Sequence, residues 1–510
     1  MKFNLARFFK NAAILTLTSL ILRLVGMFFR IWLANSIGSE GMGLYQLILA
    51  FYMLAATFAG GGITTAVTRL ISEAISRSQR GAVRRIILRS VTLVIGIGVI
   101  SAVAVIIFAK PISLYWIKDA RAELSLKLLS LSLPFMAVTA CIRGYFVAFR
   151  KVVTPSMAQL FEQVVRMAVI FFVMAKVGTS DIALACAVIL FGDSIAEAAS
   201  CAYSVVGYLI HRRNQGKSLK KEQDIKGVTA KLLHIAAPIT AGKYLTTGLR
   251  TVESMLVPIG LAAFCGDRAL SLAHYGNLKG MALPLLFFPA SFLTSLATLT
   301  VPELSGAAAR GDFGLIRRSV SRLIEITATA SVIIGGVFAL FGKDVSSLIY
   351  KEQDVGFYIT VLSPLVPFMY LESIATGCLH GLDRQGDTFK YSVIDGIVRI
   401  ALIVTMLGST GVKGFVLIMA VSNILTSTLC ISKLMDVTGI NPDFTSWLLK
   451  PIMALLPSLA VGLCVSWILG GAPLWVKTAA ECTSAVGIYL IFQAGKIKRI
   501  NQKAKPQSVD

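Results

Sequence analysis

The composition of the chain argues against a soluble protein. It has 510 residues, of which 56% are hydrophobic and only 15% are charged, and its mean hydropathy of +0.76 is rarely reached by soluble globular chains. The formal net charge of +23 would fit a nucleic-acid-binding protein, but the basic residues punctuate apolar segments and form no single basic domain. We therefore expect an all-α membrane protein without a nucleic-acid partner.

Apolar runs of about twenty residues recur along the chain, and each can cross a hydrocarbon core of ~30 Å as a helix. We place six spans in a first lobe (1–210), at 11–34, 43–71, 86–109, 124–148, 156–176 and 182–210. A basic linker (211–231) leads to a second lobe (232–435), with spans at 232–262, 273–300, 320–342, 356–380, 391–408 and 412–432. The last segment (436–510) holds spans at 450–470 and 473–494 and a basic tail. The prediction is about fourteen transmembrane helices.

The connections between the spans differ in charge from one side of the membrane to the other. No signal-peptide cleavage site follows the basic N-terminus, so we expect the N-terminus to stay in the cytoplasm. The loops on that side are strongly basic, with Arg77, Arg80, Arg84 and Arg85 in the first of them. The opposite loops are short and nearly balanced, as with Lys118, Asp119, Arg121 and Glu123. By the positive-inside rule, both termini should face the cytoplasm.

Cysteine and histidine give no sign of a metal site. The eight cysteines lie singly in or beside apolar runs without CxxC spacing, and the four histidines are dispersed. We interpret the cysteines as small packing residues, and we expect neither a metal nor a cofactor.

Three landmarks in the first lobe recur in the second at an offset of 220 to 237 residues. The segments LPFMAVTACIRGYF and VPFMYLESIATGCLHGL both contain PFM and close on a basic residue followed by glycine, Arg143-Gly144 and His380-Gly381. An acid and an arginine four residues apart follow in each copy, and cations seven apart mark spans one and seven. Because six spans return the chain to its starting side, the repeats should be parallel, as in transporters that bind substrate between two halves.

Several cations fall inside predicted spans, where a charge costs ~2.5–3.5 kcal/mol unless it faces protein or water. In span one, Arg23, Gly26 and Arg30 share one helix face, and in span seven so do Lys243 and Arg250. Lys279 in span eight is a further candidate. Guanidinium groups suit phosphate oxygens, so these five cations are candidate ligands of a pyrophosphate head group. The alternatives are ion pairs with neighbouring helices or snorkelling to the interface, which we also expect of Arg69.

Acidic residues in the spans allow two interpretations. Glu162 with Arg166, and Asp395 with Arg399, have the spacing of ion pairs within one helix, and we interpret these pairs as structural. Alternatively, Asp395 with Glu253 of span seven would bind a coupling Na⁺ or proton, and Asp193 with Glu197 would do the same in the first lobe.

The segments RLVGMFFRIWLANSIGSEGMGLYQ and AGGGITTAVTRLISE resemble the polysaccharide-transporter branch of the multidrug/oligosaccharidyl-lipid/polysaccharide (MOP) exporter superfamily, and YGNLKGMALPLLFFPASF and PELS agree with it. The pattern maps onto residues of spans one and two, namely Arg23, Gly26, Arg30, Gly38, Glu40, Gly41, Gly43, Leu44 and Tyr45. This resemblance implies two six-helix lobes in a V around a central cavity and, as in related lipid II flippases, a C-terminal helix pair beside a hydrophobic groove. It also implies cavity arginines in span one, and in span eight an arginine where this chain has Lys279.

The function expected from the residues and the resemblance is a flippase in a bacterial cell membrane. Its substrate would be a lipid-linked anionic saccharide of the lipid II type, moved outward by alternating access for spore-cortex or other cell-wall synthesis. Its partners would be membrane lipids and cell-wall synthesis proteins, and the chain itself a monomer. The alternatives are an exporter of teichoic or capsular precursors, a drug/cation antiporter, and a membrane glycosyltransferase or polymerase. An enzyme would need a catalytic constellation on a sizeable loop, and the outer loops are short.

Overall fold

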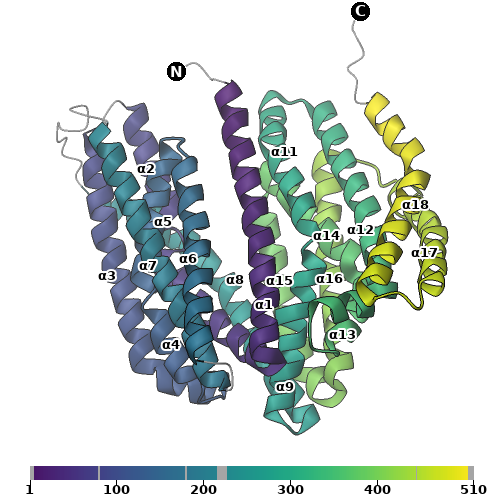
Figure 1. Cartoon of the computed structure of the whole chain (residues 1–510). Helices are drawn as coiled ribbons and strands as arrows, with labels where there is room; N and C mark the ends of the chain where they lie inside the picture. The colour runs from purple at the N-terminus through teal and green to yellow at the C-terminus, as the bar shows by residue number, and fades with distance from the viewer. Residues whose placement is uncertain (1–4, 78–80, 178–180, 215–226, 444, 504–510) are drawn as a thin grey trace, which may run out of the picture. The chain divides into compact units, whose positions relative to one another are not determined.

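The computed structural model describes residues 5–77, 81–177, 181–214, 227–443 and 445–503. Within these ranges every regular element is a helix and no strand occurs, which confirms the all-α prediction (Figure 1). The middle of the predicted basic linker (residues 215–226) and the end of the basic tail (residues 504–510) lie outside the described residues.

The helices form two compact units. Unit 1 contains Met1–Phe29, Ser36–Ile259 and Asp267–Gly276, and unit 2 contains Arg30–Asn35, Gly260–Gly266 and Asn277–Asp510. Unit 1 is built from most of α1 (Leu5–Gly60), α2 (Ile63–Ser76), α3 (Ala82–Pro111), the π-helix η1 (Ile112–Ile117), α4 (Ala122–Ser130), α5 (Leu133–Ala148), α6 (Val153–Val177), α7 (Ile182–Asn214), most of α8 (Val228–Cys265) and α9 (Arg268–Tyr275).

Most of unit 2 follows α9 in the chain. It contains the π-helix η3 (Gly276–Ala282) from Asn277 on, α10 (Leu283–Phe287), α11 (Ala290–Arg310), α12 (Phe313–Ile349), α13 (Val355–Leu362), the 3-10 helix η4 (Ser363–Leu365), α14 (Val366–Gly381), α15 (Gln385–Leu402), η5 (Ile403–Leu407), α16 (Gly408–Thr438), η6 (Thr445–Leu449), α17 (Lys450–Ile468) and α18 (Leu474–Lys503). The units group helices by packing, so the lobe boundaries proposed from the sequence stay a prediction.

Ten helical segments of the described residues are long and apolar enough to cross a membrane. Two of them, Leu17–Ser76 and Gln385–Thr438, have 60 and 54 residues. At 1.5 Å per residue each would be ~80 Å or longer, far more than the hydrocarbon core. Gly38 (φ 70°) breaks the first and Gly411 (φ 59°) breaks the second, in both cases between two predicted spans. Each long segment therefore accounts for two spans, and the total of fourteen stays a prediction.

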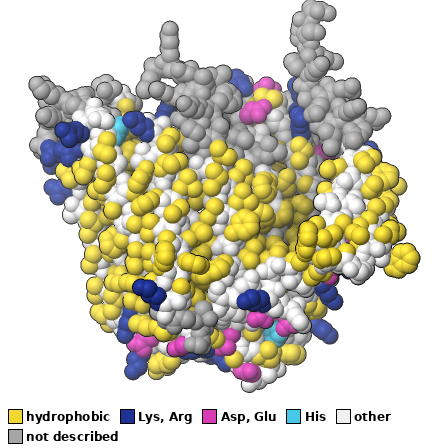
Figure 2. Space-filling model, in the orientation of Figure 1, with side chains coloured by type: hydrophobic (Ala, Val, Ile, Leu, Met, Phe, Trp, Pro, Cys, Tyr) yellow, Lys and Arg dark blue, Asp and Glu magenta, His cyan; other side chains and the backbone are white. Residues whose placement is uncertain are grey.

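The outer face of the unit 1 helices is apolar. Figure 2 shows hydrophobic side chains over the middle of these helices and charged side chains toward their ends. Ile100 and Ile107 of α3 and Phe172 of α6 are each about two-thirds exposed. Such a large exposed apolar surface needs lipid around it, so the chain is a multi-pass membrane protein.

The repeat seen in the sequence recurs in the packing inside each unit. In unit 1, α5 packs against α2, α3 and α7, and in unit 2, α14 packs against α11, α12 and α16. Thr68 of α2 donates a hydrogen bond to the backbone oxygen of Gly144 at 3.1 Å, and Ser305 of α11 donates one to that of Gly381 at 2.7 Å. The two donors and the two acceptors are each 237 residues apart. The basic-glycine landmarks thus occupy equivalent positions in the two units.

The last two helices form a pair on unit 2. Helices α17 and α18 pack against each other and against α12, where Phe341, Ala485 and Tyr489 share one apolar cluster. Gly462 allows the close approach, since a Cβ atom there would lie 2.9 Å from the ring of Phe341. The two helices lie where spans were predicted at 450–470 and 473–494, and α17 lies in one of the ten segments that can cross a membrane.

Candidate functional site

The two arginines of span one lie in different compact units. Arg23 belongs to unit 1 and its side chain is exposed, whereas Arg30 belongs to unit 2 and is half-buried. Residues 30–35 are held in unit 2 by Asn35, whose Nδ2 donates to the backbone oxygen of Ile349 at 2.8 Å and whose Oδ1 accepts from the backbone N–H of Lys351 at 2.9 Å. The predicted convergence of Arg23 and Arg30 on one ligand therefore stays a prediction.

The two cations of α8 are both exposed in unit 1. Lys243 donates a hydrogen bond to the backbone oxygen of Gly61 at 2.7 Å. Arg250 lies near the middle of α8, and among the described residues it makes no ion pair. An exposed and uncompensated guanidinium at this depth would be costly against lipid, so a water-filled surface is the favourable environment for it.

Contacts with α1 set the rotation of α8. Thr251 donates to the backbone oxygen of Ala50 at 2.9 Å, and the hydroxyl groups of Thr57 and Thr247 are 3.4 Å apart. These threonines turn one face of α8 toward α1. Arg250, one position before Thr251, is left on an adjacent exposed face.

The glycine run at 60–62 lets α8 approach this closely. A Cβ atom on Gly62 would collide with the backbone oxygen of Ala236 and lie 2.8 Å from the hydroxyl oxygen of Thr240. The helix also stops here, because α1 ends at Gly60 and α2 begins at Ile63. Close approach and local unwinding, both uses of small residues in membrane packing, thus occur together at this run.

The remaining candidates of spans seven and eight, Glu253 and Lys279, are less exposed than Lys243 and Arg250. Glu253 of α8 is buried, with 5% of the residue exposed. Lys279 lies in the π-helix η3 and is half-buried, and π-helical turns are frequent at functional sites. Beside it, Asn277 is buried and its Oδ1 atom has no hydrogen-bond partner among the described residues.

The predicted acid-arginine pair of the first repeat forms in unit 1 and gains a second acid. Arg166 lies 2.7 Å from the carboxylate of Glu162 and 2.8 Å from that of Asp193 on α7. It also donates to the side-chain oxygen of Gln163 at 2.9 Å. One guanidinium thus holds two helices together, which agrees with the structural interpretation of the pair.

The corresponding pair in unit 2 is joined by a hydroxyl group from a second helix. Arg399 lies 3.0 Å from the carboxylate of Asp395, and its Nε donates to the hydroxyl oxygen of Ser422 on α16 at 3.1 Å. Ser422 also donates to Asp395. A coupling cation at Asp395 would have to displace this guanidinium. Because Asp395 lies in unit 2 and Glu253 in unit 1, their joint role as an ion site stays a prediction.

Metal ligation has no support in the described ranges. No group of three His, Cys, Asp or Glu side chains there is placed to hold a metal ion.

The sequence did not predict an ion cluster at the break in α1. Glu40 of the G-x-E-G-x-G-L-Y pattern lies 2.7 Å from Arg121, which also lies 2.8 Å from Asp119. These two acids, Asp119 first, raise the pKa of the Arg121 guanidinium above its ordinary value. Arg268 of α9 donates to the backbone oxygen of Ile117 beside the cluster. The motif glutamate is therefore an anchor between segments distant in sequence.

The glycines of the same pattern serve close packing. A Cβ atom on Gly43 would collide with the backbone oxygen of Leu272 in α9, and one on Gly276 would collide with that of Ser39. The start of span two and α9 therefore touch through their backbones. This contact, like the ion cluster, depends on the tertiary packing of unit 1.

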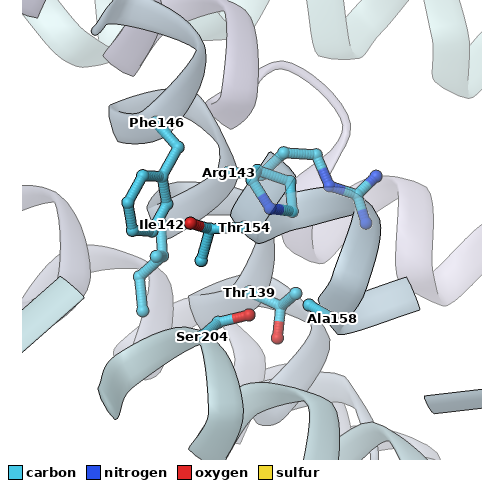
Figure 3. Close-up of a pocket in the computed structure, with 8 residues that line it drawn as sticks. Thr139, Ile142, Arg143, Phe146, Thr154, Ala158 and Ser204 are labelled. Carbon is cyan, nitrogen blue, oxygen red and sulfur yellow. The ribbon is translucent and has the colours of Figure 1, made fainter. Parts of the chain in front are cut away.

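Arg143, the basic member of the first basic-glycine landmark, borders a small cavity in unit 1. Figure 3 shows the hydroxyl groups of Thr139, Thr154 and Ser204 around this space, with Phe146 and Ile142 beside them. The cavity volume of about 10 Å³ is close to the room that one water molecule needs. The Nε atom of Arg143 is buried and has no hydrogen-bond partner among the described residues.

Comparisons with known proteins agree with this architecture. Stage V sporulation protein B of Bacillus subtilis (strain 168) is 22% identical over 488 residues, covering 95% of this chain and 94% of that protein. The solved structure of the lipid II flippase MurJ in an inward closed conformation aligns with a TM-score of 0.69 at 14% identity, covering 95% of this chain and 99% of that chain. An inward-facing multidrug resistance MATE family transporter of the MOP superfamily aligns with a TM-score of 0.66 at 10% identity, covering 83% and 98%.

The helices and their apolar surfaces define a multi-pass membrane protein whose fold is shared with the solved MurJ and MATE structures. Residues 8–308, more than half of the chain, match the family described as polysaccharide biosynthesis protein, and the chain belongs to this family. None of the three relatives carries the name of an enzyme.

Proposed function

We propose that the chain is a flippase that moves a polyprenyl-pyrophosphate-linked saccharide of the lipid II type from the inner to the outer leaflet. Membership of the polysaccharide biosynthesis family supports this, as does a fold shared with a protein named as a lipid II flippase. The name of the relative from Bacillus subtilis supports a role in sporulation, where the saccharide would serve the spore cortex.

The observation that carries the proposal is the exposed Arg250 in the middle of α8. Together with Lys243, one face of this helix presents two positive charges that no described acid neutralises. A guanidinium offers paired donors to phosphate oxygens and stays charged at physiological pH. This face of α8 would thus attract a pyrophosphate head, and Arg23, Arg30 and Lys279 stay predicted ligands.

The membrane potential would favour outward movement of such a substrate. We place both termini in the cytoplasm because the loops on that side are basic. With the cell interior at −100 mV, moving one negative charge outward gains about 2.3 kcal/mol. A doubly charged head gains about twice that, so export does not require a coupling ion. Coupling to Na⁺ or H⁺ at Asp395 or Glu253 would add to this drive.

The test is outward movement of fluorescent lipid II in proteoliposomes that contain the purified full chain. We expect Arg23→Ala/Arg30→Ala and Lys243→Ala/Arg250→Ala to lose at least tenfold in rate, because each lost charge-assisted hydrogen bond is worth ~1.5–3 kcal/mol. Arg213→Ala, an exposed cation at the end of α7, is the control and should transport normally. Full transport by both double variants would contradict the proposal.

The fold shared with a MATE transporter supports a second candidate, a drug/cation antiporter. Such a protein would need free carboxylates for a cationic substrate, but Asp395, Glu162 and Asp193 are all engaged by arginine. Uptake of a cationic dye driven by a proton or Na⁺ gradient would favour this candidate. Movement of a teichoic or capsular lipid precursor in preference to lipid II would instead change the substrate within the proposed class.

A further inference from the structure

A cavity in unit 1 lies between the last turns of α2 and the first turns of α8. Its volume is about 730 Å³, and it is lined by Arg69, Leu70, Glu73, Ala230, Lys231, His234, Ile235, Pro238 and Ile239. The two helices meet at Gly62 and Ala236. From there they run toward the end of α2 and the start of α8, and the cavity opens between them.

The charge in this cavity is predominantly positive. Arg69, Lys231 and His234 have exposed side chains and form no ion pair with the described residues. Glu73 is the one acid in the lining, and its carboxylate lies 2.7 Å from Arg77 outside the cavity. Arg69, Lys231 and His234 are therefore left without an ion-pair partner among the described residues.

The floor of the cavity is apolar. Leu70 is 8% exposed and joins Val228 and Leu232 in the hydrophobic core of unit 1, with Ile235 packed against it. Pro238 and Ile239 extend the apolar wall. Cations above an apolar floor suit a phosphate that is carried on a hydrocarbon chain better than a free anion.

The depth of the cavity agrees with a lipid head group. Arg69 lies seven residues before the end of α2 at Ser76, or about 10 Å along the helix. The site therefore begins about two helical turns before the end of α2, a depth that a lipid head group at a membrane surface can reach. A volume of this size is typical of small-molecule sites.

We propose that this cavity binds a phosphate group carried on a lipid of the cytoplasmic leaflet. The leaflet follows from the topology given under the proposed function, whereas the site itself does not depend on which substrate is transported. The lipid phosphate would come from an acidic phospholipid that stays bound or from a polyprenyl pyrophosphate saccharide that docks before entry. Arg69, Lys231 and His234 would bind it, and Glu73 would be kept from repelling it by Arg77.

The test measures lipid binding to the purified full chain in nanodiscs of phosphatidylcholine. Fluorescent phosphatidylglycerol, lipid II and inorganic pyrophosphate are titrated separately as probes. We expect Arg69→Gln/Lys231→Gln to weaken binding of at least one lipid about fivefold for each cation removed. The conservative pair Arg69→Lys/Lys231→Arg should retain binding, and Arg213→Gln is the control for loss of a cation elsewhere.

The three probes distinguish the two possible sources of the lipid phosphate. Weakened binding of phosphatidylglycerol alone identifies a resident phospholipid, and weakened binding of lipid II alone identifies a docking site for substrate. Equal binding of every lipid by wild type and Arg69→Gln/Lys231→Gln overturns the proposal, as does an effect on pyrophosphate without an effect on either lipid. Because these variants keep Arg23, Arg30, Lys243 and Arg250, the result is independent of the transport test above.

Discussion

The acid-arginine clusters of the two repeats differ in the side chain that a second helix supplies to the arginine. In unit 1, Arg166 lies between two carboxylates, Glu162 and Asp193. In unit 2, Arg399 contacts the carboxylate of Asp395 and the hydroxyl group of Ser422 on α16. The arginine of the first cluster thus bridges carboxylates from two helices, and that of the second bridges a carboxylate and a hydroxyl group from two helices. Both repeats therefore tie two helices together through an arginine, with a different side chain supplied by the second helix.

Removing the arginine should separate the two clusters most clearly. Arg166→Ala leaves two carboxylates uncompensated, and breaking a buried pair costs ~3–5 kcal/mol. Arg399→Ala should cost less, about 1–3 kcal/mol, because Ser422 still donates to Asp395. Thermal unfolding of the purified protein in detergent measures both, with Arg213→Ala as the control. A larger fall in unfolding temperature for Arg399→Ala than for Arg166→Ala would contradict this expectation.

The glycines that break α1 and α16 give a second comparison between the units. Gly38→Ala and Gly411→Ala each force a side chain into a backbone conformation that costs about 1–3 kcal/mol. Gly411→Ala should be the worse of the two, because its Cβ atom would also strike the ring of Phe264. Gly26→Ala, in open space within α1, is the matched control and should leave the unfolding temperature unchanged. Equal stability of all three variants would exclude strain at the breaks.

The hydroxyl group that completes the second cluster should have a smaller effect. Ser422→Ala removes hydrogen bonds to both Asp395 and Arg399 and should cost about 1–2 kcal/mol. The control is Ser331→Ala, which loses one hydrogen bond to the backbone of its own helix and should cost less. If the unfolding temperatures of the two variants fall equally, Ser422 is not part of the cluster.

A more exposed ion pair in unit 1 should give the smallest loss of stability. Lys127 lies 2.6 Å from Glu123, and their side chains are 42% and 32% exposed. Exposed pairs contribute ~0.2–1 kcal/mol, so Lys127→Ala should hardly shift the unfolding temperature. A loss as large as that of Arg166→Ala would mean that burial does not govern the clusters.

The features that could be predicted from the sequence are those set by the spacing of residues along a single helix. Acid and arginine four residues apart predicted both ion pairs, and the apolar runs predicted the helices. The first of these helices ends at the glycine run 60–62. Each of these features follows from the period of a helix or from the steric freedom of glycine.

Contacts between helices were not predictable in the same way. Asp193 joins Arg166 from the next helix, and Glu40 joins Arg121 from 81 positions away. Such partners depend on the rotation and register of packed helices, which a single sequence does not specify. For the same reason Arg69, expected to snorkel, lines a cavity with α8. The roles of the candidate cations of spans one, seven and eight stay predictions.

Equilibrium binding of lipid II to the purified chain tests the central claim, that uncompensated cations within the spans bind an anionic lipid head. Wild-type protein should bind saturably, and Lys243→Ala/Arg250→Ala should bind at least tenfold more weakly, whereas Arg213→Ala should bind like wild type. Undiminished affinity in Lys243→Ala/Arg250→Ala would contradict the account.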